Sequence, residues 1–145
     1  MHVLSRLALL ALLSSPMAVA EVHEVKMLNR GAAGAMVYEP DFLRLQPGDS
    51  VRFLSSQSGH NAATIDGLLP AGAEPFKSKI NQPLEVTFDV PGFYGIQCSP
   101  HVSMGMVMAI QVGEPGAATP VPPASLNLRA SQRLTTIIQR ELPPR

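Results

Sequence analysis

The stretch that decides the fold runs from Leu84 to Val112 and reads LEVTFDVPGFYGIQCSPHVSMGMVMAIQV. Apolar residues occupy every second position in its first part, LEVTFDV, and this alternation predicts a β-strand with one buried face. A Pro-Gly turn follows. The alternation then returns in the residues leading to Cys98 and again from Met106 onward. The stretch therefore predicts three strands, the last two joined by a short loop between Cys98 and Met106.

Similar short patterns precede this stretch and are separated by turn-forming sequences such as GAAG and PGD. The segments predicted to be extended are residues 24–29, 36–38, 43–45, 51–53 and 63–65. Residues 68–79 are rich in Gly and Pro, so we expect an irregular crossover with at most one helical turn. Seven or eight short strands at this spacing predict an all-β fold, a two-sheet sandwich with Greek-key connections.

The loop after the second of the three strands carries the chain's one cysteine. His101 and Met106 follow Cys98 within that loop, and His60 lies upstream in the polar loop QSGHN. A thiolate, two imidazoles and a weak axial thioether form the donor set of a type 1 copper centre. We therefore predict one copper ion bound by His60, Cys98, His101 and Met106. The alternatives for a lone cysteine are a free thiol and a bridge to another chain.

Three nearby residues bear on this predicted centre. Met104 is the rival axial ligand, but Met106 is favoured because it opens the final strand. Pro100 has no backbone N–H, so it should withhold one hydrogen bond from the thiolate. Asn61, next to His60, is expected to contribute one remaining donor and to tie the two ligand loops together.

This donor set predicts electron transfer and no enzymatic activity. Catalysis by copper needs an open coordination position and usually a second metal or proton-handling groups. With two histidines committed to copper, only His23 is left in the exported chain. A copper carrier or storage protein is the main alternative, because Met104, Met106 and Met108 form a Met-rich stretch. Alternation instead directs Met106 and Met108 into the sandwich. A sandwich without any metal is the third interpretation.

The N-terminus has the pattern of a secretory signal. A positive Arg6 is followed by an apolar run, 7–13, and by Ala18-Val19-Ala20, a typical cleavage site. We expect residues 1–20 to be removed, leaving a periplasmic protein that begins at Glu21. The apolar run is too short to span a bilayer, so membrane insertion is not expected.

Charge is close to balanced, with 11 Lys and Arg against 11 Asp and Glu in the full chain. Loss of Arg6 with the signal leaves a formal charge of about −1, far from the clustered positive charge that nucleic-acid binding requires. We expect a monomer that binds no nucleic acid.

The chain after the strands divides into two parts. Residues 114–125 form a Pro-rich link between a sandwich domain, 21–113, and the tail, 126–145. In the tail, apolar residues recur every four positions, namely Leu126, Ala130, Leu134, Ile138 and Leu142. This spacing predicts an amphipathic helix, or two short ones split near Ser131, packed by its apolar face on the sandwich.

Residues 25–112 resemble the cupredoxin family of type 1 blue copper proteins, and within it the pseudoazurins. The C-x2-H-x4-M loop is shared with plastocyanin, whereas the stretches MLNRG and GAEPFKSKIN and the helical tail are typical of pseudoazurins. The resemblance implies a plastocyanin-like Greek-key sandwich, C-terminal helices folded back on it, and copper ligation by the four residues named above. It also implies a periplasmic electron carrier that serves a nitrite reductase or a c-type cytochrome by transient contact.

By the same resemblance, the ring edge of His101 reaches the surface within an apolar docking patch. The residues expected to form this patch are Met36, Pro100, Val102 and Met104. Relatives commonly surround the patch with lysines, whereas this chain has neutral Ser58 and Gln97 near the ligands. Arg30, Lys77 and Lys79 are the cations that remain to attract an acidic partner, so we expect weakened electrostatic steering.

Overall fold

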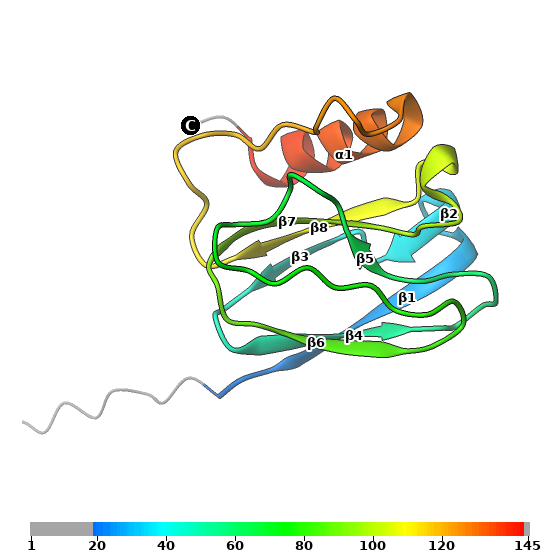
Figure 1. Ribbon diagram of the computed structural model, residues 1–145, viewed down its shortest axis with the longest axis horizontal. Helices are drawn as coiled ribbons and strands as arrows, with labels where there is room; N and C mark the ends of the chain where they lie inside the picture. Colours follow the sequence, from blue (N-terminus) through cyan, green and yellow to red (C-terminus); the bar gives the residue numbers. More distant parts are fainter. Residues whose placement is uncertain (1–18, 144–145) are drawn as a thin grey trace, which may run out of the picture.

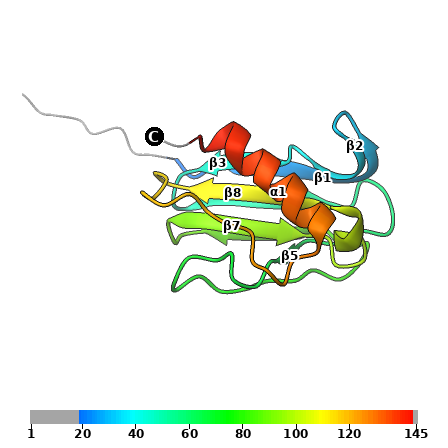
Figure 2. The ribbon, with the colours of Figure 1, turned by 90° about the horizontal axis from the view of Figure 1, so that it is seen from above.

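The computed structural model describes residues 19–143. Within that range, eight strands form two four-stranded sheets packed face to face, and one helix lies on the outer face of the second sheet (Figures 1 and 2). The predicted β-sandwich with a C-terminal helical extension is thereby confirmed. Residues 1–18 of the predicted signal lie outside the described residues.

The first sheet has the strand order β2-β1-β4-β6. Its strands are β1 (Val22–Gly31), β2 (Gly34–Glu39), β4 (Asp49–Leu54) and β6 (Leu84–Phe88). β1 and β2 are antiparallel and turn at the sequence GAAG, where the pattern predicted a break. β4 pairs in parallel with β1 and antiparallel with β6.

The second sheet has the order β3-β8-β7-β5. Its strands are β3 (Phe42–Leu45), β5 (Ala63–Thr64), β7 (Gly92–Gln97) and β8 (Val107–Val112). The Pro47-Gly48-Asp49 turn carries the chain from β3 to β4, and the Pro91-Gly92 turn carries it from β6 to β7. Both predicted turns are therefore corners between the two sheets and do not close hairpins within one sheet.

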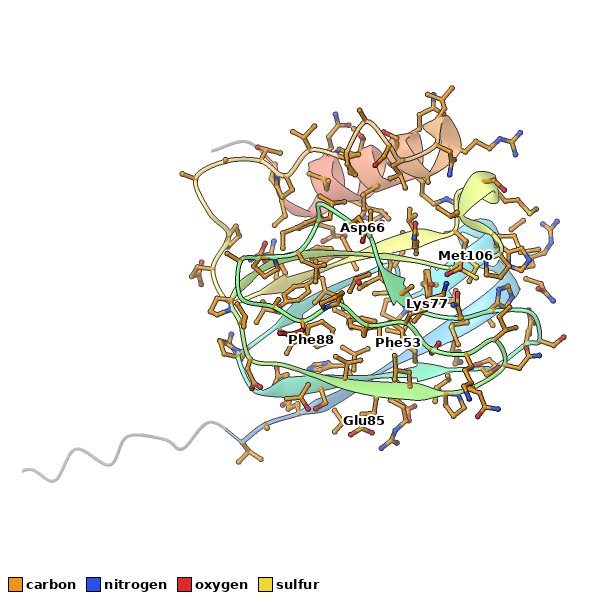
Figure 3. The ribbon with its side chains drawn as sticks, viewed as in Figure 1. Phe53, Asp66, Lys77, Glu85, Phe88 and Met106 are labelled. Atoms are coloured by element: carbon orange, nitrogen blue, oxygen red, sulfur yellow. The ribbon has the colours of Figure 1, made fainter. Side chains whose placement is uncertain are left out.

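The main core lies between the sheets, and it contains Phe53 and Phe88 of the first sheet, each packed against Phe76 (Figure 3). β8 is buried along its whole length. Met106, Met108 and the other residues of the predicted alternation pack in this main core. The intervening Val107 and Ala109 belong to a second core that lies under the helix. A helix on the outer face thus explains why β8 is apolar on both sides.

The C-terminal tail forms a single helix, α1 (Leu128–Glu141), so the alternative of two helices split at Ser131 is wrong. Asn127 caps the helix, because its side-chain oxygen accepts a hydrogen bond from the N–H of Ala130 at 3.1 Å. Ser131 lies in the first turn. The apolar residues Ala130, Leu134, Ile137 and Ile138 are buried against the second sheet.

The connections that matter for the site are short or irregular. Residues 68–79 contain no helix, as predicted. The loop from Cys98 to Met106 includes one 3-10 turn, η1 (Val102–Met104). No helix among residues 19–143 has the length and apolarity to cross a bilayer.

Candidate metal centre

Two loops bring the predicted ligands together at one end of the sandwich. Cys98 directly follows β7, and its N–H donates to the carbonyl of Met106 at 3.0 Å, which closes the base of the loop before β8. His101 lies within this loop, and its N–H donates to the carbonyl of Cys98 at 3.0 Å. His60 comes from the connection between β4 and β5, 38 residues before Cys98. The site therefore exists only when the two sheets are assembled.

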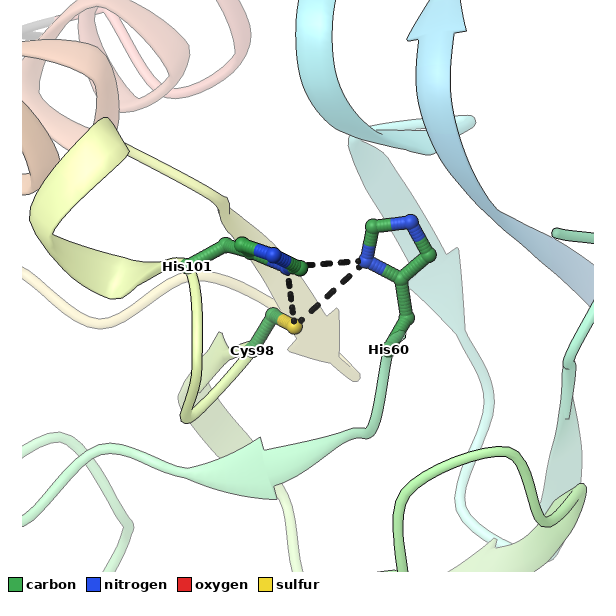
Figure 4. Close-up of side chains that lie close together, drawn as sticks. All are labelled: His60, Cys98 and His101. Carbon is green, nitrogen blue, oxygen red and sulfur yellow. Dashed lines mark hydrogen bonds between the residues drawn. The ribbon is translucent and has the colours of Figure 1, made fainter. Parts of the chain in front are cut away.

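The donor atoms of three ligands face one another (Figure 4). The Sγ of Cys98 lies 3.7 Å from Nδ1 of His60 and 3.5 Å from Nδ1 of His101, and the two Nδ1 atoms are 3.1 Å apart. A point equidistant from these atoms is about 2 Å from each, which is the length of a bond from imidazole nitrogen to a first-row metal such as zinc. In the described part of the chain, no other group of three His, Cys, Asp or Glu side chains converges in this way.

Met106 completes the set from the core side. Its side chain is fully buried in the same cluster as Cys98, whereas that of Met104 is exposed on η1. The soft thiolate and thioether with two imidazoles suit a copper ion that changes oxidation state. The residues present therefore fit type 1 copper held by His60, Cys98, His101 and Met106.

Burial alters the protonation of two ligands. It lowers the pKa of His60, and the neighbouring His101 adds to this effect. It raises the pKa of the Cys98 thiol, although the backbone N–H groups of Asn61 and His101 act in the opposite direction. His60 is thus kept in the neutral form that binds metal, while Cys98 must lose a proton to bind it.

The orientation of His60 depends on Asn29, a residue that the sequence analysis did not identify. Nε2 of His60 lies 2.8 Å from Oδ1 of Asn29 at the end of β1. Donation from Nε2–H leaves the lone pair of Nδ1 free for the metal. Asn29 belongs to the MLNRG stretch that carries the family resemblance, but nothing in its spacing relates it to a histidine 31 residues later.

Asn61 connects the two ligand loops. Its Oδ1 accepts the N–H of Ser99 at 2.7 Å, and its Nδ2 donates to the carbonyl of Ser78 and to the hydroxyl of Ser99. The backbone N–H of Asn61 lowers the pKa of the Cys98 thiol, and the described hydrogen bonds of the Asn61 side chain go to Ser78 and Ser99. The side chain therefore holds the His60 loop against the residue that follows Cys98.

The other predicted residues differ in exposure and in position. His101, Met36 and Val102 are half-buried, and Pro100 and Met104 are exposed. Lys77 and Lys79 line a hollow together with Pro100. Arg30 lies on β1, opposite Ala35 of β2, and does not line that hollow. His23 is remote in the fold, half-buried beside Asp49, and takes no part in the centre.

Comparison with known proteins agrees with this geometry. The family model of copper-binding proteins of the plastocyanin/azurin family matches residues 25–113. A pseudoazurin from Paracoccus pantotrophus is 50% identical over 107 residues, which cover 74% of this chain and 72% of the relative.

Solved structures extend the likeness to the whole fold. A pseudoazurin from a Sinorhizobium species superposes with a TM-score of 0.79 at 42% identity, covering 85% of this chain and 98% of that structure. The pseudoazurin of Methylobacterium extorquens AM1 gives a TM-score of 0.73 at 41% identity, covering 82% and 98%. With this fold and this ligand set, the chain belongs to the plastocyanin/azurin family of copper-binding proteins, as one of its pseudoazurins.

Proposed function

We propose that this chain is exported to the periplasm, cleaved after Ala20, and shuttles single electrons between redox proteins such as a c-type cytochrome and a nitrite reductase. The observation that carries the proposal is the convergence of three buried or half-buried donor atoms around one point. Donors held by two loops of a packed sandwich would need little rearrangement between oxidation states. Small rearrangement favours electron transfer over metal release.

Each ligand contributes a separate property. Copper bound at this centre supplies the change between Cu(I) and Cu(II). When copper is bound, Cys98 would supply a soft thiolate ligand that leads into β7, and Met106 would supply a weak thioether ligand that adjusts the potential. His60 is fully buried, whereas His101 is half-buried. His101 would therefore be the route for electrons between bound copper and a partner.

The groups around the sulfur adjust the centre further. Pro100 cannot donate a backbone hydrogen bond, whereas the backbone N–H groups of Asn61 and His101 act to lower the pKa of the Cys98 thiol. Fewer donors to a thiolate change the reduction potential, because each one stabilises its negative charge. Asn61 keeps its donor in place through the bonds of its side chain to Ser99.

The docking surface is the apolar patch around His101, formed by Met36, Pro100, Val102 and Met104. A small apolar contact excludes water briefly without binding tightly, as redox encounters require. Lys77 and Lys79 share a hollow with Pro100, and Arg30 is paired with Ala35, the neighbour of Met36. These cations attract an acidic partner surface. The protein acts as a monomer, with residues 21–113 as the copper domain, 114–125 as the link, and 126–145 as the tail.

The burial of two methionines argues against a role as a copper carrier or storage protein. Met106 and Met108 have no exposed surface, so only Met104 of the Met-rich stretch is accessible to a copper donor or acceptor. A carrier should lose copper readily to a chelator. A shuttle should hold its copper through repeated oxidation and reduction.

The decisive experiment is Cu(II) addition to the purified protein, followed by visible absorption, with Cys98→Ser as the matched variant. An intense thiolate-to-copper charge-transfer band that is absent from the variant is the expected result. Absence of the band in folded wild-type protein would overturn the electron-carrier proposal. Intact mass of the exported protein tests cleavage after Ala20.

Partner choice requires a second measurement. The reoxidation rate of the reduced protein by a nitrite reductase should decrease with salt, and less steeply for Lys77→Gln/Lys79→Gln. Equal salt dependence of the wild-type and variant proteins would show that the two lysines do not contribute to docking.

A further inference from the structure

Arg133 of α1 binds the main chain on both sides of the copper end of the sandwich. Its Nη1 donates to the carbonyl of Met36 at 2.6 Å and to the carbonyl of Gly105 at 2.8 Å, and its Nη2 donates to the carbonyl of Ala35 at 3.3 Å. Met36 lies in β2 and Gly105 lies in the ligand loop. One side chain of the C-terminal helix thus joins two segments that are distant in sequence.

Two of the three carbonyls that Arg133 binds belong to residues with positive φ. Gly105 has φ of 89°, a left-handed conformation, and it immediately precedes Met106. Met36 has φ of 51°, which is rare for a residue with a side chain and is maintained only by surrounding contacts. Arg133 is therefore bonded to Met36, whose side chain disfavours its backbone conformation, and to Gly105, whose conformation suits glycine.

A second residue of the tail holds the other end of the same segment. Nδ2 of Asn127, the helix cap, donates to the carbonyl of Val102 at 2.8 Å. The turn η1 is thus attached to α1 at its first residue by Asn127 and just after its last residue by Arg133. η1 lies directly between the ligands His101 and Met106, so the helix constrains the spacing of both.

The chemistry of Arg133 suits this task. Its guanidinium is a planar group with five donors, and it reaches three carbonyls at once, which a lysine ammonium cannot match in geometry. Among residues 19–143, Arg133 forms no ion pair with a carboxylate. Its described hydrogen bonds all end on main-chain carbonyls, so they fix backbone and do not serve charge pairing.

We propose that Arg133 is a positioning residue for the axial ligand of the copper centre. By binding the Gly105 carbonyl, Arg133 fixes the point at which Met106 enters the core. By binding the Met36 carbonyl, it also fixes the position of the docking patch relative to Met106. Because the axial ligand tunes the potential of such centres, the tail helix adjusts the redox properties from outside the ligand set. This inference rests on the type 1 centre described above.

The test compares Arg133→Lys and Arg133→Met with Arg129→Lys and Arg129→Met in the copper-loaded protein. Arg129 lies one turn earlier on α1, is exposed, and makes no side-chain hydrogen bond to a described residue. The reduction potential and the visible and EPR spectra should shift in both Arg133 variants, and by more than in either Arg129 variant. The lysine variant separates the effect of hydrogen-bond geometry from the effect of charge, because it keeps the positive charge but loses the planar guanidinium.

A readout without copper completes the test. Amide exchange at Gly105 and Met106 should be faster in copper-free Arg133→Lys than in wild-type protein, with Val25 in the core unchanged. A reduction potential and spectra equal to wild type in Arg133→Lys would overturn the proposal that Arg133 positions Met106, because the positive charge alone would then be sufficient. Reduced stability without any spectral or redox shift would also overturn it. Absence of the thiolate band in wild-type protein would instead refute the electron-carrier proposal.

Discussion

Asn29 holds His60 from the side of the ring that faces away from the other ligands. Nε2 of His60 is 2.8 Å from Oδ1 of Asn29, while Nδ1 of the same ring lies 3.7 Å from Sγ of Cys98. One hydrogen bond thus decides both the tautomer and the direction of a buried ligand. Such outer partners contribute strongly to metal affinity because they fix the ligand before the metal arrives.

Asn29→Ala should weaken copper binding about 10- to 100-fold, since His60 then loses its orienting partner. Competition with a chelator measures the affinity. Gln57→Ala is the control, because the Gln57 side chain accepts the backbone N–H of Asn29 at 2.6 Å and makes no described hydrogen bond to His60. Equal affinity of Asn29→Ala and Gln57→Ala would show that the bond to His60 does not matter.

Met106→Gln should change the reduction potential and the visible spectrum, because it replaces the weak thioether with a harder oxygen donor. Met104→Gln should leave the spectrum unchanged, since Met104 lies on η1 with its side chain exposed. Voltammetry and absorption of the two variants test the axial assignment. A spectral change in Met104→Gln alone would reverse it.

Copper uptake should release a proton from Cys98 at neutral pH. Burial raises the pKa of this thiol, so it is protonated before the metal binds and must become a thiolate afterwards. Titration of copper-free protein with Cu(II) in a weak buffer containing a pH indicator measures the release. Cys98→Ser should release one proton fewer per bound ion, and equal release would contradict a protonated thiol.

Asp49 should stabilise the fold except in acid. The N–H of Glu21 donates to its carboxylate and is the largest cause that lowers the pKa of Asp49, with help from the N–H of Gln46 and from His23. A lowered pKa in the folded state gives stability above the ordinary carboxyl pKa of about 3.9, and that stability is lost as pH falls through the folded value.

Asp49→Asn should therefore lower the free energy of unfolding by about 1–3 kcal/mol at pH 7 and by less near pH 3. Urea unfolding of the copper-free proteins at the two pH values measures this. The exposed Asp89→Asn serves as the control. A loss in Asp49→Asn that does not depend on pH would show that the carboxylate charge is not responsible.

Leu134→Ala should cost about 2–5 kcal/mol of folding free energy, because this fully buried residue fills the space between α1 and the second sheet. Leu128→Ala, on the same helix, should change stability by less than about 0.5 kcal/mol, since its side chain is 71% exposed. Denaturant unfolding of both variants without copper makes the comparison. Similar losses would mean that α1 is not packed as described.

Local sequence was sufficient to predict most of the strands and the donor set. Alternation over LEVTFDV and around Met106 predicts strands, because a half-buried strand has a period of two residues. The set of Cys98, His101 and Met106 lies in one short loop, so its spacing alone indicates a metal centre. The four-residue repeat of the tail likewise predicts an amphipathic helix.

Tertiary structure alone decided the relationships between distant segments. The pairing of His60 with Asn29, and of Arg133 with Gly105, joins residues whose separation in sequence carries no periodic signal. The corners at Pro47-Gly48 and Pro91-Gly92 are equally ambiguous, because the same turn chemistry serves a hairpin or a change of sheet. The physical reason is that hydrogen-bond partners across a sandwich are chosen by sheet packing, which depends on all strands together.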